Sequence, residues 1–133
     1  MDGHFSFRTD PAIGLIRITM SGLFTPADVA AFLAARDEAH AALGCAPNQH
    51  LTLNDLRGMK IQPQEIVAEF REMLAAPRYR SRRLAFVIGP TLARAQLMRA
   101  LGTRQVRCFE DPAEAEAWLR ADEDEAEPLR RTG

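Results

Sequence analysis

The chain has 133 residues, of which 47% are hydrophobic and 26% charged, and its formal net charge is −1. This length suits a single domain that buries its own core. The near-neutral charge disfavours a dedicated nucleic-acid-binding protein, and the short apolar runs predict no transmembrane helix. The N-terminus lacks the basic and apolar regions of a secretory signal, so a cytoplasmic protein is expected.

The N-terminal third predicts an antiparallel hairpin followed by a helix. Residues 4–8 and 15–20 alternate apolar and polar side chains on either side of a turn-rich segment. Thr25 and Pro26 form a typical helix start, with the threonine as cap and the proline in the first helical position. Gly44 is expected to end this helix.

The rest of the chain predicts alternating strands and helices. Strands are expected at residues 50–54, 83–88 and 105–109, and helices from Pro63, from Gly89-Pro90 to Gly102, and from Asp111-Pro112. Residues 55–60 are expected to form a loop. The order β-β-α-β-α-β-α-β-α predicts a single-domain α/β fold whose mixed sheet is mainly parallel after the N-terminal hairpin. The domain is expected to span residues 1–121, with 122–133 as a charged, flexible tail.

Parallel strands bring their carboxyl ends to one edge of the sheet, where open α/β sheets bind ligands. We call this edge the carboxyl-end rim. It is predicted to hold the start of every helix: Thr25-Pro26, Gln62-Pro63, Gly89-Pro90 and Asp111-Pro112.

The opposite edge is predicted to carry a run of arginines. Such a basic patch could bind an acidic protein, an anionic lipid surface or RNA, although charge runs are more often solvated surface. The candidate patch consists of Arg78, Arg80, Arg82, Arg83 and Arg104.

Catalytic and metal-binding patterns are missing from the sequence. The three histidines and two cysteines do not fall at metal-ligand intervals, so no metal or cofactor is expected. Cys45 lies five residues before His50, which leaves a Cys–His pair as the weakly supported enzymatic alternative. The sequence otherwise predicts no enzyme.

Two short motifs resemble the SpoIIAA-like proteins of the STAS-like superfamily. Residues 53–58 (LNDLRG) resemble the Asp-Leu-x-Gly that ends a strand in this family. Residues 106–111 and 114–119 are similar to the family's closing strand, helix cap and Ala-x-x-Trp-Leu helix. The resemblance covers residues 4–121 and implies the STAS-like fold and a non-enzymatic regulatory or protein-interaction module.

The chain departs from the anti-sigma-factor-antagonist branch of this superfamily at one functional position. The resemblance implies a phosphorylated serine near the start of the second helix. Here that stretch is residues 61–65, and no Ser or Thr occurs between Thr52 and Ser81. A phosphorylation switch of this kind is therefore not expected.

Two hypotheses for function follow. The first is binding of an unidentified protein partner at the carboxyl-end rim, through Asp55, Leu56, Arg57, Gly58, Lys60 and Glu65. The alternative is a small-molecule or lipid-binding module with an apolar pocket beside the sheet, lined by Phe24, Met59, Ile61 and Phe70. The sequence leaves a homodimer open.

Overall fold

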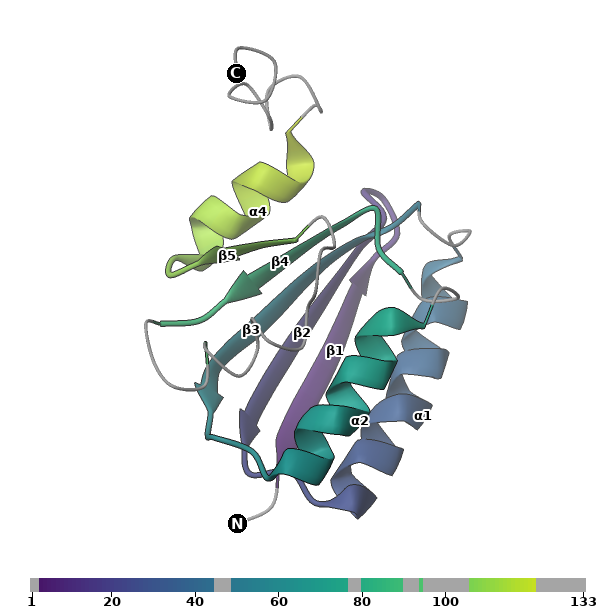
Figure 1. Cartoon of the computed structure of the whole chain (residues 1–133). Helices are drawn as coiled ribbons and strands as arrows, with labels where there is room; N and C mark the ends of the chain where they lie inside the picture. Colours follow the sequence, from purple (N-terminus) through teal and green to yellow (C-terminus); the bar gives the residue numbers. More distant parts are fainter. Residues whose placement is uncertain (1–2, 45–48, 77–79, 90–93, 95–105, 122–133) are drawn as a thin grey trace.

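The computed structural model describes residues 3–44, 49–76, 80–89, 94 and 106–121 (Figure 1). Five strands form one sheet in the order β1-β2-β3-β4-β5, with β1 antiparallel to β2 and the other neighbours parallel. The strands are β1 (His4–Asp10), β2 (Leu15–Gly22), β3 (Leu51–Met59), β4 (Arg83–Val87) and β5 (Val106–Phe109), and the helices are α1 (Pro26–Leu43), α2 (Gln64–Ala75) and α4 (Pro112–Arg120). The predicted α/β fold is confirmed. The third predicted helix falls on residues 90–102, of which only Arg94 is described, and residues 122–133 also lie outside the described part.

The helices are divided between the two faces of the sheet (Figure 1). Strand order advances steadily from β2 to β4, and right-handed crossovers then place α1 and α2 on the same face. Helix α4 packs on the other face, against β3, β4 and β5. Successive strand residues point to opposite faces, so Ile16 lies in the core under α1 and α2 while Leu15 lies in the core under α4.

The start and end of α1 are set by the residues that the sequence predicted. The Oγ1 atom of Thr25 accepts a hydrogen bond from the backbone N–H of Asp28 at 3.1 Å, and the Asp28 carboxylate accepts one from the Thr25 N–H at 3.0 Å. This reciprocal capping box satisfies backbone donors that the first helical turn leaves unpaired. At the other end, Gly44 adopts φ 76°, the left-handed conformation that glycine reaches without steric cost.

Strand β3 is longer than predicted, because residues 55–59 belong to it and do not form a loop. The sequence Asn-Asp-Leu-Arg-Gly has turn-forming residues, which indicated a loop. Tertiary pairing overrides that local preference: β2 also continues through Ser21 and Gly22, which pair with Gly58 and Met59 after a register shift. Helix α2 also differs from its predicted limits. It begins one residue later, at Gln64, and Pro63 is its N-cap.

The predicted basic patch is wrong in one of its members. Arg83 is only 1% exposed, because it is the first residue of β4 and points to the face covered by α4. Its Nη1 atom donates to the backbone oxygens of Trp118 and Ala121 at 2.9 and 2.8 Å. Arg80 and Arg82 are exposed, and Arg78 and Arg104 lie outside the described residues.

Candidate functional site

The carboxyl-end rim forms as predicted, with Pro90 outside the described residues. The parallel register of β2 to β5 brings the ends of these strands to one edge of the sheet. Hydrogen bonds join neighbouring parts of the rim: the Phe24 N–H donates to the Gln62 side chain at 2.9 Å, and the Ile88 N–H donates to the Phe109 carbonyl at 2.8 Å. Figure 1 shows β2, β3 and the starts of α1 and α2 meeting there, at the lower edge of the view.

The connector between β3 and α2 is held in place by one buried side chain. Gln62 is 7% exposed; its amide oxygen accepts from Phe24, and its Nε2 donates to the carbonyl of Gly22 at 3.0 Å and to that of Lys60. A buried amide with these partners fixes the surrounding backbone. The preceding residue, Ile61, points outward and is 48% exposed. The rim thus presents a large apolar side chain on a connector that is hydrogen-bonded to the end of β2 and to the segment after it.

An ion pair lies beside this connector on β3. Arg57 donates from Nε and Nη2 to the Asp55 carboxylate at 3.0 and 2.7 Å. Residues two apart on a strand point to the same face, which brings the two side chains together. The side-chain hydrogen bond from Arg57 lowers the pKa of Asp55 below its ordinary 3.8, while partial burial of the carboxyl opposes that effect.

The ion pair between Asp55 and Arg57 predicts that the stability of the fold depends on pH in the acidic range. Folding lowers the pKa of Asp55, so the stabilisation from its ion pair is complete above the ordinary value of 3.8. It is lost as the pH falls through the lower folded-state value. In Arg57→Gln the pKa of Asp55, followed by carboxyl NMR, should rise toward 3.8. Lys60→Gln is the control and should leave it unchanged. An unchanged pKa in Arg57→Gln would contradict the role of the ion pair.

The other residues predicted for partner binding do not all reach the surface. Leu56 is 7% exposed and belongs to the core under α1 and α2, so its assignment to a partner contact is wrong. Alternation along β3 explains this, because Leu56 points away from the face that carries Asp55 and Arg57. Gly58, Lys60 and Glu65 are exposed. At Gly58 an added Cβ would meet the Cβ of Ser21 at 2.8 Å, so a side chain there would force β2 and β3 apart.

The four residues predicted to line an apolar pocket do not share one environment. Phe24 is 1% exposed, and its ring packs edge to face on that of Phe70 with the centroids 5.7 Å apart. Phe70 and Met59 are partly buried against the same core, whereas Ile61 is on the surface. The aromatic rings therefore occupy the space between sheet and helices.

Two features of the rim were missed by sequence reasoning. Gln62 was assigned only to the helix start, although it is the buried anchor of the connector, and Ile61 was assigned to a pocket and not to the rim surface. One signal was available for Ile61: it is an isolated apolar residue between Lys60 and Gln62 in a short connector. The burial of Gln62 depends on Gly22 and Phe24, about forty positions earlier, and has no local signal.

The described residues show no arrangement typical of a metal centre. Within them, no three His, Cys, Asp or Glu side chains gather to hold a metal ion. His50 is 2% exposed, and its ring packs on that of His40 with the centroids 4.7 Å apart; Cys45 lies outside the described residues. None of the described helices is both long and apolar enough to span a membrane.

The five-stranded sheet, with its antiparallel first pair and its helices starting at one rim, is the architecture of the STAS-like regulatory modules. The sequence model of the SpoIIAA-like family matches residues 15–120. The chain belongs to the SpoIIAA-like family. STAS-like domains of this kind generally have no catalytic activity and interact with other proteins. No curated protein and no solved structure matches the chain.

Proposed function

We propose that this chain is a non-enzymatic STAS-like module that binds a protein partner through the carboxyl-end rim. The proposed contact surface consists of Ile61 together with the exposed side chains of Arg57, Lys60 and Glu65 on the same rim. The observation that carries the proposal is the exposure of Ile61, 48%, on a connector that Gln62 holds in place. Ile61 is the one large apolar side chain that is well exposed among the described residues.

The physical argument rests on how protein interfaces obtain their affinity. A few apolar or aromatic anchors supply most of the binding free energy, and surrounding polar residues exclude water and select the partner. An anchor that is already held in its bound position loses little conformational entropy on association. The Gln62 hydrogen bonds give Ile61 this advantage, and the exposed charged residues of the rim are of both signs. The partner expected is a protein with an apolar hollow bordered by charged side chains.

The start of α2, which belongs to this rim, has no residue that a Ser/Thr kinase could phosphorylate. No Ser or Thr lies between Thr52 and Ser81, so the start of α2 has no hydroxyl for a kinase to modify. Phosphorylation controls binding by adding a dianion at such a position. We therefore propose that binding at this rim is constitutive and that control of the complex acts through the partner or its abundance.

The test is a quantitative pull-down from the source organism with Ile61→Asp. The variant should recover at least about tenfold less of the partner than the wild type, because an anchor residue typically contributes 2 kcal/mol or more. Its fold should be intact, since Ile61 is on the surface. Lys60→Glu should give a smaller loss of the same proteins.

Arg80→Asp is the matched control, because Arg80 is exposed at the opposite edge of the sheet. It should leave recovery of the partner unchanged. Loss of the partner in Arg80→Asp with full recovery in Ile61→Asp would contradict the proposal and assign binding to the basic patch.

A further inference from the structure

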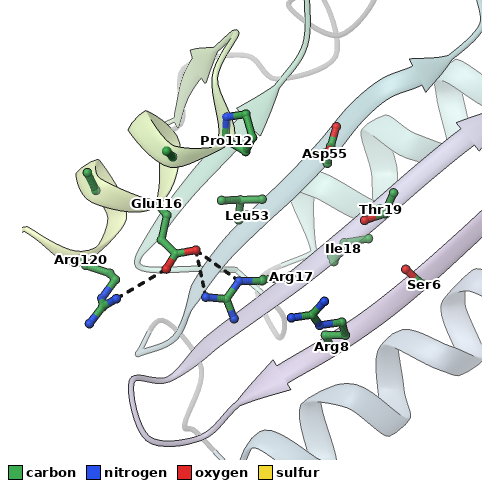
Figure 2. A pocket seen from close by; sticks show the side chains of 12 residues that line it. Ser6, Arg8, Arg17, Ile18, Thr19, Leu53, Asp55, Pro112, Glu116 and Arg120 are labelled. Carbon is green, nitrogen blue, oxygen red and sulfur yellow. Dashed lines mark hydrogen bonds and ion pairs between the residues drawn. The ribbon is translucent and has the colours of Figure 1, made fainter.

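A groove of about 570 Å³ lies on the face of the sheet opposite α1 and α2, between α4 and the strands β1, β2 and β3 (Figure 2). Its volume falls in the range of small-molecule sites. Its charged lining residues are Arg8, Arg17, Asp55, Glu116 and Arg120. The groove arises from the topology, because α4 covers the β3, β4 and β5 side of this face and leaves the β1 and β2 side to solvent.

Not every charged side chain that lines the groove has an ion-pair partner. Glu116 pairs with Arg17 at 2.9 Å and with Arg120 at 3.5 Å, as the dashed lines in Figure 2 show. Asp55 pairs with Arg57 on the adjoining part of β3 at 2.7 Å. Arg8 is exposed and has no hydrogen-bond or ion-pair partner among the described residues. Arg17 also lies 3.8 Å from the carboxylate of Asp10, which is outside the lining. Arg8 is therefore the lining arginine without a carboxylate partner among the described residues.

The strand register places the unpaired Arg8 beside a second arginine. Arg8 on β1 lies directly opposite Arg17 on β2, and like charges facing each other across an antiparallel pair destabilise a sheet. The neighbouring pair on the same face is Ser6 opposite Thr19. Two guanidinium groups and two hydroxyl groups thus gather on adjacent cross-strand pairs. An anion bound there would remove the repulsion and receive hydrogen bonds from these side chains.

The other residues that line the groove determine which kind of anion could bind there. Leu53 of β3 and Ala113 and Ala117 of α4 form apolar lining beside the arginines. Asp55 and Glu116 would repel a second negative charge on the ligand. The groove is therefore suited to a ligand with one negative charge and a small apolar body.

We propose that this groove binds a small organic monocarboxylate. Its carboxylate lies at Arg8 and Arg17 with the hydroxyl groups of Ser6 and Thr19 as donors, and its apolar body lies on Leu53, Ala113 and Ala117. This site is separate from the rim surface, and the inference does not rest on the proposed partner binding.

The test is an NMR titration of the ¹⁵N-labelled full chain with three probes that share a phenyl ring: benzoate, its neutral analogue benzamide, and the dianion phenyl phosphate. Benzoate should give saturable shifts centred on Ser6, Arg8 and Thr19. Benzamide and phenyl phosphate should each bind at least about tenfold more weakly, the first because it lacks the charge-assisted hydrogen bonds and the second because of the lining carboxylates. Equal affinity for benzoate and benzamide, or tighter binding of phenyl phosphate, would overturn the proposal.

Variants separate the charge from the shape of the groove. Arg8→Gln should weaken benzoate binding by about tenfold, and its melting temperature should rise by about 2 °C because the repulsion from Arg17 is removed. Ala117→Phe should abolish binding by filling the groove without changing any charge. Arg71→Gln, an exposed arginine of α2 on the other side of the sheet, is the control and should bind benzoate normally. Wild-type affinity in Arg8→Gln or in Ala117→Phe would overturn the site.

Discussion

Replacing Phe24 by alanine is expected to lower the free energy of unfolding by about 4 kcal/mol, the usual range for truncating a buried phenylalanine. The side chain is 1% exposed, and it lies at the centre of a ring cluster. Its ring centroid is 5.7 Å from that of Phe70 and 6.5 Å from those of Phe5 and Phe32. These rings come from β1, α1 and α2, so the cavity left by alanine would weaken the packing of both helices on the sheet.

Urea denaturation followed by circular dichroism measures this effect, and Ile61→Ala is the matched control. Both residues were predicted to line the same apolar pocket, but Ile61 is exposed and its truncation should change stability by no more than about 0.5 kcal/mol. A loss below about 1 kcal/mol in Phe24→Ala would mean that the ring lines an open cavity that tolerates truncation. That outcome would support the small-molecule alternative, and native mass spectrometry of the purified protein would then be expected to show a co-purified ligand.

Replacing Arg83 by alanine is expected to lower the free energy of unfolding by about 3 kcal/mol. Arg83 donates two hydrogen bonds to backbone carbonyls at the end of α4, those of Trp118 and Ala121, where the helix dipole also favours a positive charge. Its guanidinium lies 5.7 Å from the centroid of the Trp118 ring. Alanine would remove these contacts and leave a cavity between β4 and α4. Trp118 is the single tryptophan, so its fluorescence reports directly on the loss of α4 packing.

Arg83→Met separates the charge from the packing of the side chain. Methionine fills part of the same space, so this variant should lose less than half as much stability as Arg83→Ala. The Nε and Nη2 atoms of Arg83 have no hydrogen-bond partner among the described residues, which makes its burial costly. A Met variant more stable than the wild type would show that this cost exceeds what the two hydrogen bonds contribute, and would contradict a stabilising role for the charge.

Much of the fold was predictable because its signals are local. The Thr25 cap, Pro26 and Gly44 set the limits of α1 through hydrogen bonds and backbone conformations within one turn of the chain. The strand expected at residues 83–88 is β4, and its apolar residues Leu84 to Val87 are buried. The alternation of strands and helices then implied parallel pairing and a common rim. These inferences required no knowledge of which residues meet across the sheet.

The candidate site was less predictable because its residues depend on distant partners. Asp55 to Met59 resembled a loop, and only the continuation of β2 alongside them makes that segment a strand. Once it is a strand, Leu56 must point into the core and Arg57 must reach Asp55. The environment of Ile61 depends in the same way on Gln62, whose hydrogen-bond partners Gly22 and Phe24 belong to another part of the chain.

The sequence by itself determined the order of the elements, their helical and strand character and the existence of a carboxyl-end rim, because these follow from side-chain periodicity and from capping residues close together in the chain. It also determined that the start of α2 has no hydroxyl to phosphorylate. Tertiary structure alone decided which face each side chain occupies. A one-residue shift of the pairing register reverses the face, and contacts between strands that are distant in the sequence set that register. For that reason Arg83 is buried and Arg8 faces Arg17, while the exposure of Ile61 follows from the hydrogen bonds of Gln62 to a distant part of the chain.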